Sequence, residues 1–248
     1  MTDPFTVCYE AEGLISMARV IRNLGYKVAF LKPYVNGKIL IIRGERRRFV
    51  HYAVKQAARL EMLSKAGLEL VGYDPALTIC YRDEYSQILD DARGSFIVKL
   101  PEEWLSEQME TSDFAKRFDK IKDQVLSASR TDEFKEMYYL FTHCTERALI
   151  TQSPILWQSI LSTFGLNLIP VNVACCGMAG LFGHMAENQK QTYAVYEKNW
   201  KPELEKRDFD HCLITGFSCR SQVHRMEGKR AVHPLFVVDD LLKKALNG

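Results

Sequence analysis

Short apolar runs of strand length alternate with amphipathic stretches of helix length along the 248-residue chain. The runs typical of strands lie at 5–9, 26–31, 68–73, 137–144, 166–173 and 212–217. The stretches with helical spacing of apolar residues lie at 11–24, 46–66, 82–91, 153–164, 179–200 and 233–246. Strands that alternate with helices at this spacing predict an α/β fold with small, mostly parallel sheets flanked by helices.

The two halves of the chain show similar patterns. Phe5-Thr6-Val7-Cys8 aligns with Phe141-Thr142-His143-Cys144, Gly25 with Gly165, and Cys80 with Cys219. Correspondences of this kind are typical of an internal duplication. We therefore expect two tandem related half-domains, residues 1–100 and residues 137–248, joined by a helical connecting arm at residues 101–136.

The connecting arm is rich in charged residues over positions 101–130. Pro101 followed by Glu102 and Glu103 is typical of the start of a helix, because proline fits the first turn and acidic groups favour its positive end. The simplest interpretation is a surface helix exposed to solvent. A helix that packs at an interface is the alternative.

The chain has seven cysteines, at positions 8, 80, 144, 175, 176, 212 and 219, and an odd number cannot be fully paired within one chain. The first ten residues lack the basic and apolar regions of a signal peptide, so we expect a cytoplasmic protein with free thiols. Cys212 lies within a predicted strand and is expected to be a core residue. The other cysteines lie at or just past predicted strand ends, the edge at which parallel α/β sheets form their sites.

The second half carries four of these thiols in a spaced pattern. Thirty residues separate Cys144 from Cys175-Cys176-Gly177, and 42 residues separate Cys176 from Cys219. Four thiolates at neighbouring strand ends could form one site, and thiolate-rich sites select iron–sulfur clusters, zinc or Cu(I). Successive side chains of a strand point to opposite faces, so the adjacent pair can reach one site only where the backbone turns. Gly177 permits such a turn.

Other residues near the predicted strand ends are weaker candidates. Cys8 and Cys80 are interpreted either as relic ligands packed near the site or as a second thiol pair. Arg220 follows Cys219, where a cation would lower the pKa of a thiol and favour the thiolate; a surface arginine at a helix start is the alternative. His143 alternates to the opposite face from Cys144 and is expected to be structural.

Other function classes find little support. The formal charge of +2 is close to balance and argues against nucleic acid as a partner. No apolar run approaches the roughly 18 residues of a membrane span. The chain contains no G-x-G-x-x-G or Walker A fingerprint, and no Ser-His-Asp arrangement is indicated.

The doubled cysteine carries a family resemblance. Ala174-Cys175-Cys176-Gly177-Met178-Ala179-Gly180 resembles the CCG motif of the cysteine-rich domain family. That family includes the B subunit of heterodisulfide reductase and the iron–sulfur subunits of glycolate oxidase and of anaerobic glycerol-3-phosphate dehydrogenase. More narrowly, residues 74–77, 80–85 and 216–222 resemble the C-terminal part of long FAD-linked D-2-hydroxyacid dehydrogenases of the 2-hydroxyglutarate or lactate type. The resemblance spans nearly the whole chain.

This resemblance implies an iron–sulfur cluster, of the 4Fe–4S type, held by Cys144, Cys175, Cys176 and Cys219, with Gly177 and Arg220 beside it. It implies electron transfer from FAD on a partner domain or subunit, through a ferredoxin-like iron–sulfur domain, to an acceptor such as a quinone. The chain alone would then be an incomplete enzyme. Its expected location is the cytoplasm, either free or peripheral to the inner face of the membrane.

The sequence departs from the family pattern at two places. Lys32-Pro33-Tyr34-Val35-Asn36-Gly37 occupies the position of a first CCG, and Cys219 is followed by Arg220-Ser221-Gln222, so the terminal CxxC is missing. Four candidate ligands remain, enough for one cluster rather than two. The alternatives are a structural zinc domain that docks subunits and a thiol–disulfide redox module that uses Cys175 or Cys176.

Overall fold

The structure is a computed structural model that describes residues 1–247. Two small sheets lie within these residues, and both are parallel. The first pairs β1 (Leu70–Val71) with β2 (Val98–Lys99), and the second has the order β4 (Asn167–Pro170), β3 (Met137–Phe141), β5 (Cys212–Ile214). The predicted α/β class with small parallel sheets flanked by helices is therefore confirmed.

Helices make up most of the remaining structure. Those of the first half are α1 (Pro4–Tyr9), α2 (Ala11–Asn23), α3 (Lys38–Ile42), α4 (Arg46–Lys65), α5 (Pro75–Cys80) and α6 (Glu84–Leu89). The middle of the chain forms α7 (Pro101–Met109), α8 (Ser112–Phe118) and α9 (Lys122–Ser129). The second half has α10 (Cys144–Leu149), α11 (Ser153–Thr163), α12 (Gln189–Asn199), α13 (Lys201–Glu205), α14 (Phe217–Glu227) and α15 (Pro234–Asn247). Short 3-10 helices lie at η1 (Asp90–Arg93), η2 (Phe182–His184), η3 (Ala186–Asn188) and η4 (Phe209–His211). Within residues 1–247, none of these helices is both long and apolar enough to span a bilayer.

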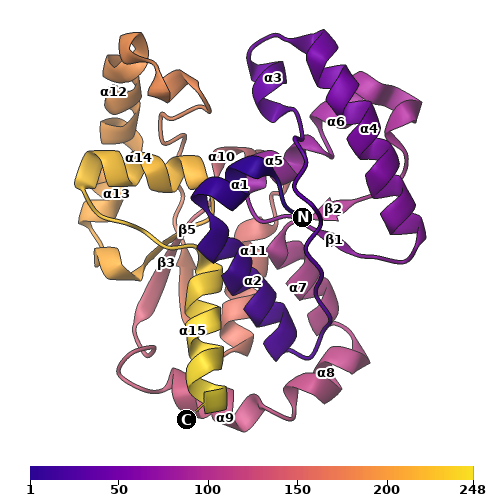
Figure 1. The fold of residues 1–248 in the computed structure, drawn as a ribbon. Coiled ribbons are helices and arrows are strands. Elements are labelled where there is room, and N and C mark those ends of the chain that lie inside the picture. Colours follow the sequence, from indigo (N-terminus) through magenta and orange to yellow (C-terminus); the bar gives the residue numbers. More distant parts are fainter. Residues whose placement is uncertain (248) are drawn as a thin grey trace.

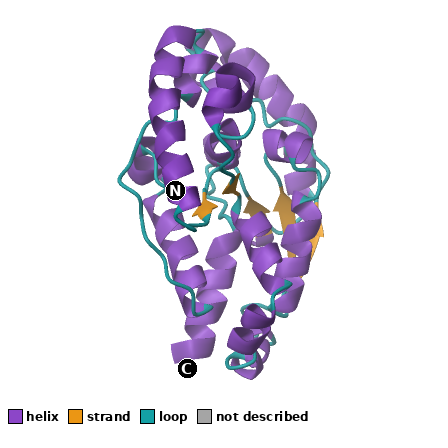
Figure 2. Ribbon diagram, turned by 90° about the vertical axis from the view of Figure 1, so that its right-hand side faces the viewer, coloured by secondary structure: helices purple, strands orange, loops and turns teal. Residues whose placement is uncertain are grey.

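The molecule has two lobes above a common base (Figure 1). One lobe contains α3, α4 and α6, and we call it the α4 lobe. The other contains α12, α13 and α14, and we call it the α12 lobe. Helices α2, α7, α11 and α15 form the base, and α8 and α9 close its lower end. The strands lie in the middle of the molecule with helices on both sides (Figure 2).

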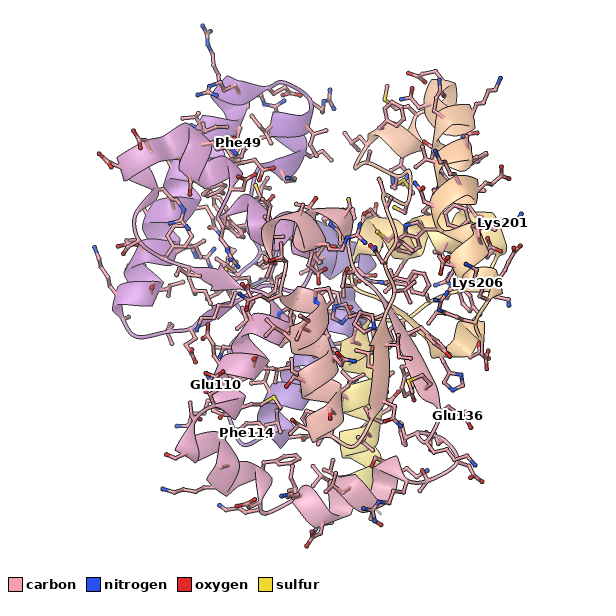
Figure 3. The ribbon with its side chains drawn as sticks, turned by 180° about the vertical axis from the view of Figure 1, so that it is seen from behind. Phe49, Glu110, Phe114, Glu136, Lys201 and Lys206 are labelled. Carbon is pink, nitrogen blue, oxygen red and sulfur yellow. The ribbon has the colours of Figure 1, made fainter. Side chains whose placement is uncertain are left out.

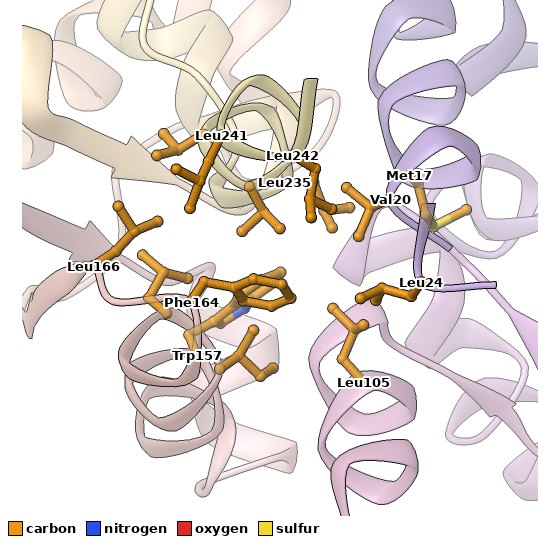
Figure 4. Close-up of a cluster of buried hydrophobic side chains, with 14 of the residues drawn as sticks. Met17, Val20, Leu24, Leu105, Trp157, Phe164, Leu166, Leu235, Leu241 and Leu242 are labelled. Carbon is orange, nitrogen blue, oxygen red and sulfur yellow. The ribbon is translucent and has the colours of Figure 1, made fainter. Parts of the chain in front are cut away.

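The base holds the largest hydrophobic core, and this core belongs to both halves of the chain (Figure 4). Val20 of α2, Leu105 of α7, Trp157 of α11 and Leu241 of α15 all contribute side chains that are fully or almost fully buried. Each such side chain stabilises the fold by about 1.5–3 kcal/mol relative to exposure. The two halves are consequently held against each other by apolar burial.

The connecting arm differs from the expected solvent-exposed helix. It forms three short helices, and each buries an apolar face in the common core. Trp104 and Leu105 of α7, Phe114 and Phe118 of α8 and Val125 of α9 are buried. A few apolar residues at spacings of one and four are enough to make a buried face, although the average composition of the segment is polar. The interface-helix alternative is the correct one.

The predicted strand at 5–9 is wrong, because this segment forms helix α1. Asp3 caps the helix by accepting a hydrogen bond from the backbone N–H of Thr6 at 3.0 Å. Pro4 occupies the first helical position, where its fixed φ suits the helix and its missing N–H costs nothing. These start signals outweigh the strand-like run of apolar residues that follows them.

Two further segments depart from the prediction. Residues 26–31 form an extended segment outside any sheet, with Tyr26 and Val28 packed against the common core. The helix expected at 179–200 begins only at Gln189. Before it, Ala179 and Gly180 have φ of 43° and 63°, values that a right-handed helix cannot include. The chain therefore makes a tight turn and two 3-10 helices before α12 begins.

Candidate functional site

Four cysteines follow the three strands of the larger sheet. Cys144 is the first residue of α10 after β3, Cys175 and Cys176 lie in the loop after β4, and Cys219 lies in the first turn of α14 after β5. Because these strands are parallel neighbours, their carboxyl ends meet at one edge of the sheet. The predicted placement of these four residues at that edge is confirmed.

The four thiols lie next to one another in series. The pKa shifts of three of them come first from a neighbouring thiol: Cys144 interacts with Cys175, Cys175 with Cys176, and Cys176 with Cys219. The backbone N–H of Gly177 also donates to the sulfur of Cys175 at 3.3 Å. Across residues 1–247, no three His, Cys, Asp or Glu side chains are grouped around a point that could hold a metal ion.

The pKa values of these thiols shift in opposite directions. The neighbouring Cys144 and Cys176 thiols lower the pKa of Cys175, and the Gly177 N–H and the nearby His143 add to this effect. The same contacts, together with burial, raise the pKa values of Cys144 and Cys176. Cys175 is therefore the first of these three thiols to become a thiolate, the form that binds metals and attacks electrophiles.

Gly177 makes the turn of the CCG loop possible. Its φ of 89° lies in the left-handed region that favours glycine. A Cβ at this position would overlap the backbone carbonyl oxygen of Thr192 in α12. The loop therefore packs directly on the α12 backbone, and only glycine fits there.

Cys8 and Cys80 do not join the row of thiols. Cys8 is exposed on α1, and Cys80 is the last residue of α5, buried in the core of the α4 lobe with Phe49 and Tyr85. The prediction that both lie at strand ends is wrong, because no strand precedes α1 and because the whole of helix α5 separates Cys80 from the end of β1. Cys212 is buried within the α12 lobe, as expected for a core residue.

Arg220 is buried beside Cys219 and holds α14 in place. Its guanidinium donates to the carbonyl oxygens of Ile214 and Thr215, each at 2.7 Å, and pairs with Glu10. These bonds tie the start of α14 to the end of β5 and to the α1–α2 junction. The alternative of a surface arginine is wrong, since only 8% of the residue is exposed.

A pocket of about 460 Å³ lies over the row of thiols, and residues of both lobes line it. Cys144, Cys175 and Cys176 line one side. The segment 35–42 of the α4 lobe lines the opposite side, and this is where the first half departs from the CCG pattern. Gly37 in this segment has a φ of 88°, almost the value at Gly177. The same left-handed turn thus recurs in both lobes, with cysteines on one side only.

The polar groups of the pocket are mostly engaged with the protein itself. Asn36 donates to the carbonyl oxygen of Leu77, and Lys38 pairs with Glu84. Asp74 caps α5 and accepts from the backbone N–H of Phe217. The surface left to a ligand comes largely from apolar side chains: Pro4, Phe5, Ile39, Ile42, Leu77, Leu181 and Phe217. Such a pocket suits an apolar molecule.

A pair of buried carboxyl groups lies behind α10, and no sequence pattern indicated it. Glu102 and Glu146 interact, and the Ser153 hydroxyl hydrogen-bonds a carboxyl oxygen of each. The Thr215 hydroxyl also donates to Glu146. Burial raises the pKa of Glu146 to about 7, and burial together with the Glu146 charge raises the pKa of Glu102 well above its usual range. The pair therefore retains protons that an exposed pair would lose. Only the spatial meeting of α7 and α10 brings these residues together.

Known proteins with similar sequences are dehydrogenases. The chain is 42% identical over 240 residues to the D-2-hydroxyglutarate dehydrogenase of Pantoea ananatis, a match that covers 97% of this chain and 22% of that protein. The enzyme of the same name from Escherichia coli is 38% identical over 241 residues, again 97% of this chain and 22% of the relative. The chain thus spans about a fifth of the length of these relatives. No family model matches it.

A more distant similarity covers a larger share of the relative. A subunit of the anaerobic glycerol-3-phosphate dehydrogenase of Escherichia coli is 23% identical over 234 residues, 91% of this chain and 54% of that relative. The chain is therefore similar to parts of larger or multi-subunit dehydrogenases. This agrees with the dehydrogenase resemblance predicted from the sequence, whereas membership of the CCG family stays a prediction.

Proposed function

We propose that the chain is an electron-transfer module of a larger flavin-linked 2-hydroxyacid dehydrogenase, in which Cys144, Cys175, Cys176 and Cys219 hold one iron–sulfur cluster of the 4Fe–4S type. The observation that carries the proposal is that four cysteines follow three neighbouring parallel strands and that three of them, Cys144, Cys175 and Cys176, line one pocket. The similarity to D-2-hydroxyglutarate dehydrogenases supports its place within such an enzyme.

The chemistry of the donor set fits this group. Four sulfur donors without a carboxylate among them suit iron–sulfur clusters better than hard cations. Cys175 contributes a thiol whose pKa is already lowered, so the loss of its proton on binding costs little. A bound cluster would take up and release single electrons. The N–H of Gly177 would tune it, because hydrogen bonds to the sulfurs affect the reduction potential.

The partners follow from the same proposal. Electrons would come from FAD on another domain or subunit, through a ferredoxin-like iron–sulfur domain, and pass to an acceptor such as a quinone. The apolar pocket beside Cys144 and Cys175 offers such an acceptor a place close to the thiols. On this proposal the chain carries electrons but does not itself oxidise a hydroxyacid.

A second candidate is a thiol–disulfide redox module. The half-buried Cys175 lines the pocket, has a lowered pKa and contacts two further thiols that could resolve a mixed disulfide. In the alternative of a structural zinc domain, the same four cysteine sulfurs would bind zinc in place of the cluster.

The decisive experiment is metal analysis of protein prepared and reconstituted without oxygen. We expect stoichiometric iron and sulfide with a broad visible absorption, and loss of most iron on replacing Cys144, Cys176 or Cys219 by Ser. Cys212→Ser serves as the control and should keep its iron. Full iron retention in the triple variant would refute the proposal. Stoichiometric zinc in a colourless protein would favour the structural zinc domain. A metal-free protein with rapid alkylation of Cys175 at pH 6 would favour the thiol–disulfide module.

A further inference from the structure

The positive charge of the chain is concentrated in the α4 lobe. Residues 32–65 contain nine lysines and arginines and two glutamates, a net charge of +7. Since the whole chain carries +2, the remaining residues carry −5. A local excess of this size creates a positive surface potential, which the small net charge of the whole chain does not reveal.

Four arginines gather at the turn between α3 and α4, and we call this segment the basic turn: Arg43, Arg46, Arg47 and Arg48. All four are exposed. Figure 3 labels Phe49, the buried residue that directly follows them, near the end of the lobe. Arg43 and Arg48 pair with Glu45, whereas Arg46 and Arg47 find no ion-pair partner within residues 1–247.

The position of the basic turn is unfavourable for the isolated fold. Arg46, Arg47 and Arg48 form the first turn of the 20-residue helix α4, which has no acidic residue among its first helical positions. The N-terminal end of a helix carries partial positive charge, so cations there are disfavoured, and they also repel one another. Contact with an anionic surface would offset both effects.

Exposed apolar side chains lie on α3, directly before the basic turn, and on the other lobe at η2. We call this set the apolar rim: Ile39 and Ile42 on α3, and Phe182 and Met185 at η2. Between 42% and 48% of each residue is exposed. The two parts of the rim belong to different lobes, and they meet where Ile42 lies against Gly180. Ile39 and Ile42 also line the pocket.

We propose that the basic turn and the apolar rim together form a docking surface for an anionic lipid membrane. Basic side chains beside exposed aliphatic and aromatic ones are the composition that binds the membrane interface, where the cations meet anionic headgroups and the apolar groups enter the acyl boundary. A nucleic acid would use the charges but leave the rim exposed to water. The pocket then opens toward the membrane.

This surface does not involve the thiols. Vesicle binding is expected equally for metal-free and reconstituted protein, so a failure to bind vesicles and a failure to bind iron are separate results.

The test is flotation of the chain with vesicles of phosphatidylcholine, with and without 30% phosphatidylglycerol, at about 0.05 and 0.5 M salt, a range in which the Debye length shortens severalfold. We expect binding only to the anionic vesicles at low salt. Arg46→Glu/Arg47→Glu should weaken it by about 25-fold or more, because each basic residue near an anionic surface contributes on the order of fivefold. Phe182→Ser/Met185→Ser leaves charge and pocket lining unchanged and should weaken it by about tenfold through lost apolar burial.

The matched control is Lys120→Glu/Lys122→Glu, which makes the same change of charge at exposed positions just before and at the start of α9, at the opposite end of the molecule. It should bind as the unchanged chain does, and circular dichroism should show all variants folded. No binding of the unchanged chain to anionic vesicles at low salt would overturn the proposal. So would equal loss in the control, or full binding by the Phe182→Ser/Met185→Ser variant.

Discussion

At the scale of single residues, the CCG loop depends on a glycine whose role can be measured. Gly177→Ala must adopt a left-handed φ and place a methyl group on the Thr192 carbonyl oxygen. We expect it to lower the free energy of unfolding by about 2–4 kcal/mol, the sum of backbone strain and overpacking. Gly67→Ala is the control, since its φ of 80° brings the strain but nothing lies within 4 Å of its Cβ. Urea denaturation should show a loss of about 1–2 kcal/mol for the control. Equal losses would mean that the contact with α12 does not matter.

The four thiols of the site could be predicted from the positions of the cysteines along the chain, directly after predicted strands. Each of Cys144, Cys175 and Cys219 follows a strand of the same sheet, and parallel strands bring their ends together. The opposite side of the pocket was not predicted. Asn36 was noted only as part of a departure from the motif, and Lys38 was not singled out. Nothing in a single sequence says that a segment without the motif still lines the site.

At the scale of elements, the strongest start and stop signals were reliable. Gly25 and Gly165, with φ of 86° and 77°, end α2 and α11 as expected of glycines after a helix. The predicted strand at 5–9 was an error because two sequence signals compete there. The apolar run favours a strand, but Asp3 as a cap and Pro4 at the first position favour a helix, and the segment forms α1. Helix α14 was missed because its buried residues were interpreted as the end of a strand and a motif, without a visible amphipathic period.

The contact between α7 and α10 gives a prediction about pH. The folded state raises the pKa values of Glu102 and Glu146, so it holds protons that the unfolded chain releases above the usual pKa of 4.5. Stability from this pair is therefore fully present below pH 4.5 and is lost as pH rises through about 7, on the order of 3 kcal/mol for Glu146. Glu102→Gln removes one ionisable group while keeping a hydrogen-bond partner for Ser153.

We expect Glu102→Gln to be more stable than the unchanged chain at pH 8 and close to it at pH 5. Urea denaturation at the two pH values measures this difference. Glu110→Gln, at an exposed position just after α7, is the control and should leave the pH dependence unchanged. An unaltered slope of stability against pH in the Glu102 variant would show that the pair does not retain its protons.

At the scale of the whole molecule, the halves predicted from the sequence share one core rather than forming separate units. Helix α2 of the first half packs against α15 of the second, and α7 of the connecting segment packs against α11. Sequence repeats indicate what each half resembles, but not where their apolar faces meet. Those faces come from elements more than 200 residues apart, as with Val20 and Leu241 (Figure 4).

A shared core predicts one cooperative unfolding transition for both halves. Leu242→Ala removes a fully buried side chain that faces Met17 and Val20 of α2 (Figure 4), and we expect it to cost about 2–5 kcal/mol through the cavity that it leaves. Because both halves depend on this contact, circular dichroism and tryptophan fluorescence should shift together to lower urea concentrations. Leu246→Ala, on the same helix but 40% exposed, is the control and should change stability by about 0.5 kcal/mol or less. Two separated transitions in the Leu242 variant would instead mean that each half is stable without the other.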